Sequence, residues 1–188
     1  MKFSTLFSIL FLSAVSVSAQ TLSNEAIRER IKELGAENAI TVELDQASNV
    51  TTIRAVADNF SSDDAKRADI RAMNFAVGLI YAGNVLNGEP GPFKLSFWVM
   101  SGKPVFAGTA AMQIYSGDEL FDIREVRHVR RERDRMEYLN IQLTREQLKS
   151  LASQSNARAF IGRHSFNFTR SQLKLFADLY MATAAGTD

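Results

Sequence analysis

The sequence predicts an α+β fold, in which an antiparallel meander sheet of about six to eight strands packs against two helices. Apolar and polar residues alternate over 93–100, as expected for a strand with one buried face. Short glycine-containing turns separate this run from its neighbours, which favours antiparallel pairing. Two apolar segments predict one long buried helix over 62–86 and a C-terminal helix over 170–184 that packs on it.

The N-terminal part of the domain begins with a helix and a hairpin. Ser23 has the side chain preferred at a helix start, an apolar stripe follows it, and Gly35 can end the helix. Alternation over 40–45 and β-branched residues over 50–56 then predict two strands joined by a short turn. This hairpin forms the first edge of the expected sheet.

The long helix is expected from the hydroxyls and carboxylates of 61–64, which suit a helix N-terminus. Residues 75–86 are apolar on nearly all sides, which is typical of a helix buried on every face. Their twelve residues are fewer than the roughly 20 needed to cross a bilayer. The same apolar segment could instead hold a structural homo-oligomer together, which is an alternative function.

Two segments near the C-terminus share one pattern. Residues 141–152 and 166–177 both run from alternating apolar positions into Thr-Arg-x-Gln-Leu-Lys. A threonine followed three residues later by glutamine predicts a capping box, in which each side chain satisfies a backbone N–H of the other residue. Each segment is therefore expected to be a strand that leads directly into a capped helix.

The proline- and glycine-rich stretch 88–92 divides the domain into parts of opposite charge. Residues 20–91 carry 7 Lys/Arg and 11 Asp/Glu, and residues 92–188 carry 14 and 10. We expect one α+β domain over 20–188, with sub-lobes 20–87 and 93–188 as the alternative division.

The first nineteen residues predict a secretory signal peptide. Lys2 precedes an apolar run of about fifteen residues, and small residues lead to Ala19 and Gln20, where cleavage is expected. The protein is thus expected to be exported, either periplasmic or secreted, with no transmembrane segment after cleavage. The chain has no cysteine, so its stability must come from apolar burial rather than disulfides.

The segment 124–135 is the one charged cluster that suggests a binding site. It contains three acids and six arginines: Arg124, Arg127, Arg130, Arg131, Arg133 and Arg135. As a strand it would place Arg127, Arg131, Arg133 and Arg135 on one face, where guanidinium groups can bind carboxylates or phosphates. The alternative is a solvated hairpin whose charges pair across strands. Without the signal peptide the formal net charge is zero and no aromatic residue interrupts the segment, which disfavours nucleic acid.

Residues typical of catalytic or metal sites are scarce. With two histidines and no cysteine we expect no metal site, and we expect no cofactor. Ser171 begins a Ser-x-x-Lys match that lacks the companion motifs of acyl-transfer enzymes. Three sites fit the acceptor pattern for N-glycosylation, at Asn49, Asn59 and Asn167.

These observations favour an exported, non-enzymatic binding or assembly protein. Its expected partner is an acidic protein or an anionic polymer of the cell envelope, held by the arginines of 124–135. A small envelope hydrolase that uses carboxylates is the second hypothesis, because two acids can converge from distant parts of a chain. The homo-oligomer through 75–86 is the third.

Overall fold

Twelve strands and three helices make up the part of the chain that the computed structural model describes, namely residues 21–57, 70–106, 108, 111–131, 133–162 and 164–184. The first elements are β1 (Thr21–Ser23), α1 (Asn24–Glu33), β2 (Ile40–Asp45), β3 (Val50–Ala57), β4 (Ile70–Ala82), β5 (Val85–Asn87) and β6 (Phe93–Ser101). Then follow β7 (Met112–Ser116), β8 (Glu119–Ile123), β9 (Arg127–Arg131), β10 (Met136–Leu143), α3 (Arg145–Ser153), β11 (Ala157–Ile161), β12 (His164–Asn167) and α4 (Arg170–Ala182). The chain is α+β and its strands pair antiparallel, as the sequence predicts.

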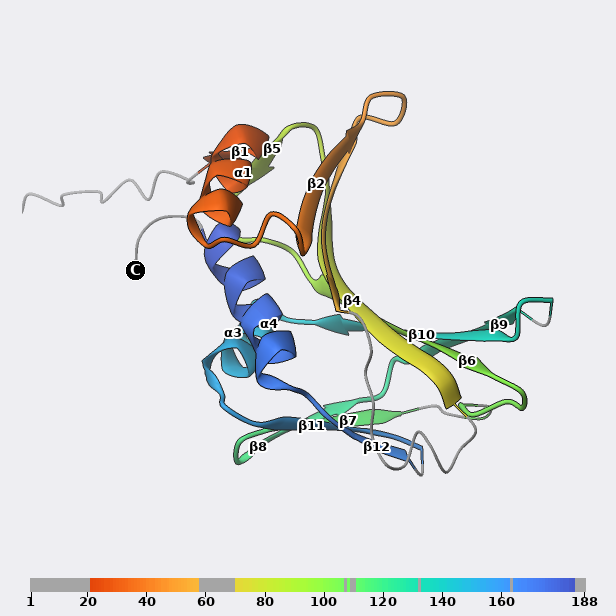
Figure 1. The fold of residues 1–188 in the computed structure, drawn as a ribbon. Helices are drawn as coiled ribbons and strands as arrows, with labels where there is room; N and C mark the ends of the chain where they lie inside the picture. Colours follow the sequence, from red (N-terminus) through yellow and green to blue (C-terminus); the bar gives the residue numbers. More distant parts are fainter. Residues whose placement is uncertain are drawn as a thin grey trace, which may run out of the picture.

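The strands form sheets of two, six and four strands rather than one meander. The six-stranded sheet has the order β2-β3-β4-β6-β10-β9, and the four-stranded sheet has the order β12-β11-β7-β8. Figure 1 shows that the helices and the four-stranded sheet lie on the same side of the six-stranded sheet, which bends strongly between β3 and β9. The opposite side of the six-stranded sheet is uncovered in this part of the chain, and we call it the open face.

Local signals at the helix starts are confirmed. Ser23 caps α1, and its hydroxyl accepts a hydrogen bond from the Ala26 N–H. Thr144 and Thr169 begin α3 and α4 with complete capping boxes. The C-terminal helix therefore forms within the predicted range 170–184, because its first turn is satisfied by residues that are neighbours in sequence.

The expected long helix over 62–86 is wrong. Residues 70–82 form strand β4, β5 follows after a turn at Gly83, and the expected helix start at 61–64 lies outside the described residues. Every second residue of β4 faces the core, from Met73 to Leu79, and the strand pairs with both β3 and β6. An apolar run of this length fits a buried strand as well as a buried helix, and long-range pairing decided between them. The homo-oligomer through a helix over 75–86 therefore loses its structural basis.

A cluster of phenylalanines joins the six-stranded sheet to the elements beneath it. Phe75 of β4 stacks on Phe176 of α4 with ring centroids 5.4 Å apart, and Phe168 meets both rings edge-on at 5.6 and 5.5 Å. Phe97 of β6 lies 6.0 Å from Phe75. The helix α4 thus packs on the sheet rather than on a second long helix, and these rings fix which sheet face is buried.

Gly78 allows β3 and β4 to approach closely where the sheet bends. A Cβ atom at this position would lie well inside the van der Waals distance of the Ile53 backbone oxygen. That oxygen belongs to the neighbouring strand, so it cannot move without disturbing the pairing of β3 with β4. Any residue other than glycine at this position would therefore force the backbone to shift.

We therefore expect Gly78→Ala to lower the free energy of unfolding by about 2 kcal/mol, measured by urea denaturation. Gly91→Ala is the matched control, because a Cβ there meets nothing within 4 Å, and its effect should stay below about 0.5 kcal/mol. Equal stability of the two variants would show that the close approach at Gly78 does not constrain the sheet.

Candidate functional site

The arginine-rich segment becomes the edge strand of the six-stranded sheet. Arg127, Val129 and Arg131 of β9 are exposed, and the alternate residues His128 and Arg130 are half-buried. The strand pairs with β10 so that Val129 lies opposite Tyr138 and Arg130 opposite Glu137. Two of the six candidate arginines therefore lie on the open face, because a strand directs successive side chains to opposite sides.

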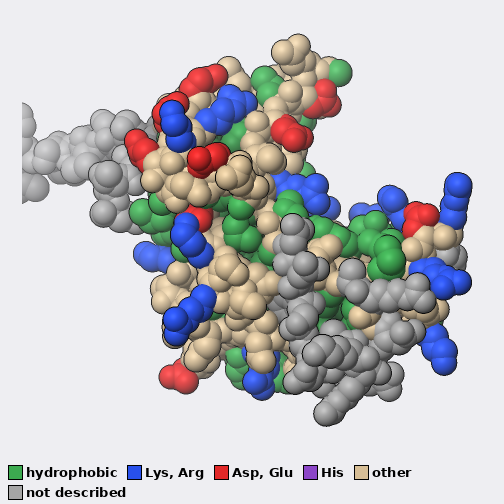
Figure 2. Space-filling view, viewed as in Figure 1, with side chains coloured by type: hydrophobic (Ala, Val, Ile, Leu, Met, Phe, Trp, Pro, Cys, Tyr) green, Lys and Arg blue, Asp and Glu red, His purple; other side chains and the backbone are tan. Residues whose placement is uncertain are grey.

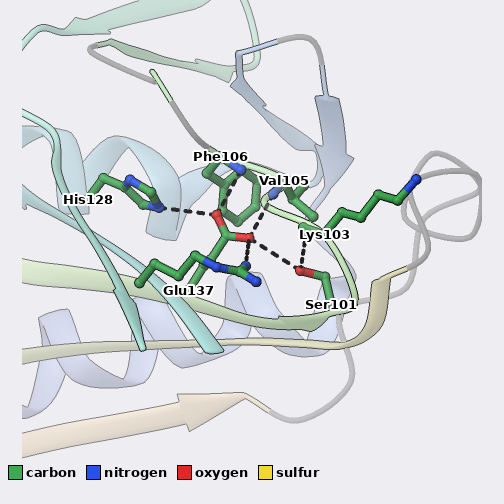
Figure 3. Close-up of polar contacts among 7 residues, drawn as sticks. Ser101, Lys103, Val105, Phe106, His128 and Glu137 are labelled. Atoms are coloured by element: carbon green, nitrogen blue, oxygen red, sulfur yellow. Dashed lines mark hydrogen bonds and ion pairs between the residues drawn. The ribbon is translucent and has the colours of Figure 1, made fainter. Parts of the chain in front are cut away.

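Glu137 is a carboxylate buried at the core of this corner of the molecule, with no exposed surface (Figure 3). Its oxygens accept hydrogen bonds from the backbone N–H groups of Val105 (2.7 Å) and Phe106 (3.0 Å). Arg130 Nη1 lies 2.9 Å from Oε1, and His128 Nε2 lies 3.1 Å from Oε2. Glu137 thus ties the arginine-rich strand and the segment after β6 to β10.

The hydroxyl of Ser101 completes the surroundings of this carboxylate. It lies 3.2 Å from Glu137 Oε1 and 2.7 Å from the Lys103 carbonyl oxygen, and its single proton can serve one of these acceptors at a time. Burial raises the pKa of Glu137, but the hydrogen bonds from Phe106, Val105, His128 and Ser101 outweigh it, so the pKa lies below its ordinary value. The group is therefore a charged structural anchor rather than a proton donor at neutral pH.

The remaining candidate arginines differ in their placement. Arg130 is directed inward to Glu137, with 12% of its side chain exposed, and does not share the open face with Arg127 and Arg131. Arg124 precedes β9 and pairs with Asp122 at 3.3 Å. Arg133 and Arg135 are exposed in the turn after β9, so they do not share a strand face with Arg127 and Arg131 as predicted. The strand ends at Arg131, which pairs with Met136 of β10, and the turn between them breaks the strand alternation on which that prediction depended.

The open face gathers further cations that the sequence did not connect with this segment. Arg54 on β3 and Lys94 on β6 point to the same side as Arg127 and Arg131, as the register of the strands requires. Among the described outward positions from β3 to β9, these four are the charged residues, and all are positive, while the edge strand β2 adds the acids Glu43 and Asp45 to the same side. Only the pairing of distant strands brings them onto one surface.

Two aromatic residues lie between these cations. Trp98 and Tyr138 face each other across β6 and β10. The Arg54 guanidinium lies over the Trp98 ring at 5.7 Å from its centroid, and that of Arg131 lies over Tyr138 at 5.4 Å. Such contacts hold the guanidinium groups at the surface with hydrogen-bond donors still directed outward. The sequence alternation of 93–100 could have indicated that Trp98 belongs to this face, because it assigns Trp98 to the exposed side of its strand.

A groove with a volume of about 920 Å³ crosses one end of the open face. Its walls include apolar residues from β4 and β9, Ile80 and Val129, whose exposed fractions are 58% and 38%. Lys94 and Arg127 also line it. Figure 2 shows the molecule hollowed between the β2–β3 hairpin and the β9 arm, with hydrophobic side chains in the hollow and Lys or Arg beside it.

The described lining of the groove contains few groups typical of catalysis. Glu125 is the one carboxylate in its described lining, whereas carboxylate-based hydrolysis needs a pair. Ser171 lies in the first turn of α4, with its hydroxyl 2.9 Å from that of Thr169. His164 is buried beside Phe106, with ring centroids 6.3 Å apart. Neither Ser171 nor His164 lines the groove.

Two further searches of the described residues returned nothing. No three histidine, aspartate or glutamate side chains in this part of the chain come together as metal ligands. No described helix has the length and hydrophobicity needed to span a bilayer.

Comparisons of the chain with family models, with curated proteins and with solved structures find no match.

Replacement of the buried carboxylate should destabilise the fold. We expect Glu137→Gln to lower the free energy of unfolding by about 3 kcal/mol at pH 7, because Arg130 loses its anionic partner in a buried site. Urea denaturation measures the change. Glu25→Gln is the matched control, since that side chain is 76% exposed and its loss should cost less than about 0.5 kcal/mol.

The pH dependence follows from the lowered pKa of Glu137. The unfolded chain takes up this proton first as the pH falls, so the stabilisation is complete above about pH 4.5, the ordinary value, and is lost through the lower pKa of the folded state. The stability difference between the native protein and Glu137→Gln should therefore shrink from pH 5 to pH 3. A constant difference over this range would contradict the assignment of charge to Glu137.

Proposed function

We propose that this chain is an exported binding protein that holds an acidic protein or an anionic polymer on its open face. The observation that carries the proposal is the charge of that face. Its described outward positions from β3 to β9 present Arg54, Lys94, Arg127 and Arg131, whereas the acids of this face, Glu43 and Asp45, lie on the edge strand β2. Several cations on one concave surface attract and orient an anionic partner, although the whole chain is nearly neutral.

The construction of the surface supports a specific role for the two strand arginines. The inward contacts of Arg130 and His128 with Glu137 hold β9 against β10, and this fixes Arg127 and Arg131 on the other side. Arg131 is further held over the Tyr138 ring. A preorganised guanidinium loses less conformational entropy on binding than a free one, so each ion pair with a partner gains affinity.

The proposed export depends on residues 1–19. Their charged start, apolar run and small residues before Gln20 have the order that a signal peptidase requires. We expect N-terminal sequencing of the natural product to begin at Gln20, in a periplasmic or secreted fraction. A product that starts at Met1 in the cytosol would contradict export. It would not affect the binding proposal, which the titration experiment below tests separately.

Removal of the two outward arginines of β9 tests the binding proposal. We expect Arg127→Ser/Arg131→Ser to weaken binding of poly-L-glutamate and of a sulfated polysaccharide by about tenfold at 50 mM salt, and to reduce the salt dependence. Trp98, the single tryptophan of the chain, lies on the same face, and its fluorescence can follow the titration.

The matched control removes two positive charges elsewhere. Lys149→Ser/Arg158→Ser changes the net charge equally, and both residues are exposed on α3 and β11, away from the open face. This variant should bind the probes within about twofold of the native protein. Equal losses in both variants would indicate unspecific charge attraction, and no binding by the native protein would reject the proposed function.

A further inference from the structure

We propose that the groove binds an extended polypeptide segment that presents both acidic and aliphatic side chains to it. This inference rests on the proposed function and narrows its partner from any polyanion to one class of polymer. It depends on three observations. Aliphatic residues are exposed in the groove, cations lie beside them, and arginine side chains already cover the nearby rings of Trp98 and Tyr138.

The floor of the groove is aliphatic at both ends. Ile80, near the end of β4, leaves 58% of its surface exposed, and Val129 of β9 leaves 38%. Pro92 lies in the same lining. Exposed aliphatic residues in a groove gain free energy when a partner covers them with apolar groups. A polymer with acidic groups alone, such as polyglutamate, has no aliphatic side chains that could cover the floor of the groove.

Positively charged residues lie beside the aliphatic floor. Lys94 of β6 and Arg127 of β9 line the groove, and Arg124 stands beside them with 85% of its side chain exposed. Glu125 is the single acid of the described lining, so the groove has a net positive charge. An acidic polypeptide with aliphatic side chains matches both features, because carboxylates can pair with the cations while apolar groups cover the floor.

The aromatic rings argue against a nucleic acid or a sugar polymer. Bases bind single-strand platforms by stacking on exposed aromatic faces. On this surface, guanidinium groups already lie over the rings of Trp98 and Tyr138. Neither ring lines the groove, and the described lining contains no aromatic residue. The rings therefore position arginines and do not form a stacking platform.

The dimensions of the floor suit an extended chain. From β4 to β9 the groove crosses three strand spacings, which is about 14 Å and equals four or five residues of extended polypeptide. Asn140 and Gln142 on β10 face the same groove and offer amide groups to the backbone of such a chain. Lys94 and Arg127 lie on the same sheet face as Ile80 and Val129, so the side of the segment that meets this face must carry both aliphatic and acidic side chains.

Synthetic decapeptides provide the test with the mature protein. A Glu-Val peptide with the repeat Glu-Glu-Val-Val, which puts both residue types on each side of an extended chain, should bind at least about tenfold more tightly than decaglutamate, and the corresponding Lys-Val peptide should not bind measurably. A single-stranded oligonucleotide and a sulfated polysaccharide of similar charge should bind no better than decaglutamate. Isothermal titration calorimetry measures the affinities, and a negative heat-capacity change for Glu-Val alone would report apolar burial.

Ile80→Ser/Val129→Ser isolates the contribution of the floor. This variant should weaken Glu-Val binding by about tenfold and leave decaglutamate binding within about twofold. Both positions are exposed, so the fold does not depend on them. Leu120→Ser is the matched control, because Leu120 is 45% exposed on β8 of the other sheet and its loss should change neither affinity.

The outcomes separate this inference from the proposed function. If decaglutamate and Glu-Val bind equally well, and the floor variant changes neither, the polypeptide inference fails while the anion-binding function stands. Tighter binding of the oligonucleotide or the polysaccharide would overturn the inference in favour of that polymer. If no anionic probe binds at all, both proposals fail.

Discussion

The one-sided burial of the six-stranded sheet is the constraint on which the rest of the structure depends. Phe75 stacks on Phe176 of α4, Phe168 closes the cluster, and the four-stranded sheet covers the same side of the sheet. The three described helices lie on this side as well, so the core forms on one face of the sheet. The opposite face is left to polar and partly apolar side chains, which lie outside this core.

The second constraint is the buried carboxylate of Glu137, which links stability to that surface. A charge without exposed surface persists only with several donors, and here backbone and side-chain donors from three segments converge on it. Because Arg130 turns inward to Glu137, Arg127 and Arg131 turn outward. The ion pair between Arg130 and Glu137 thus supports the register that directs Arg127 and Arg131 outward.

Prediction from the sequence succeeded where the structure depends on neighbours along the chain and failed where it depends on the pairing of distant strands. The caps at Ser23, Thr144 and Thr169 were predictable because each joins residues three positions apart. The expected helix over 62–86 was wrong because an apolar run satisfies a buried helix and a buried strand equally, and β4 gains its hydrogen bonds from β3 and β6. Gly78, at the centre of that run, was the available warning, since glycine disfavours a helix interior.

The sequence by itself determined the α+β class, the cap residues and the arginine-rich segment as a candidate contact, because these depend on composition and on neighbours along the chain. The signal peptide over 1–19 stays a prediction of the same kind. The tertiary structure alone decided which arginines face outward, and it brought Arg54, Lys94, Ile80 and Trp98 to the same surface. The physical reason is strand register, since a shift of one residue reverses every side chain and local sequence does not fix the pairing of distant strands.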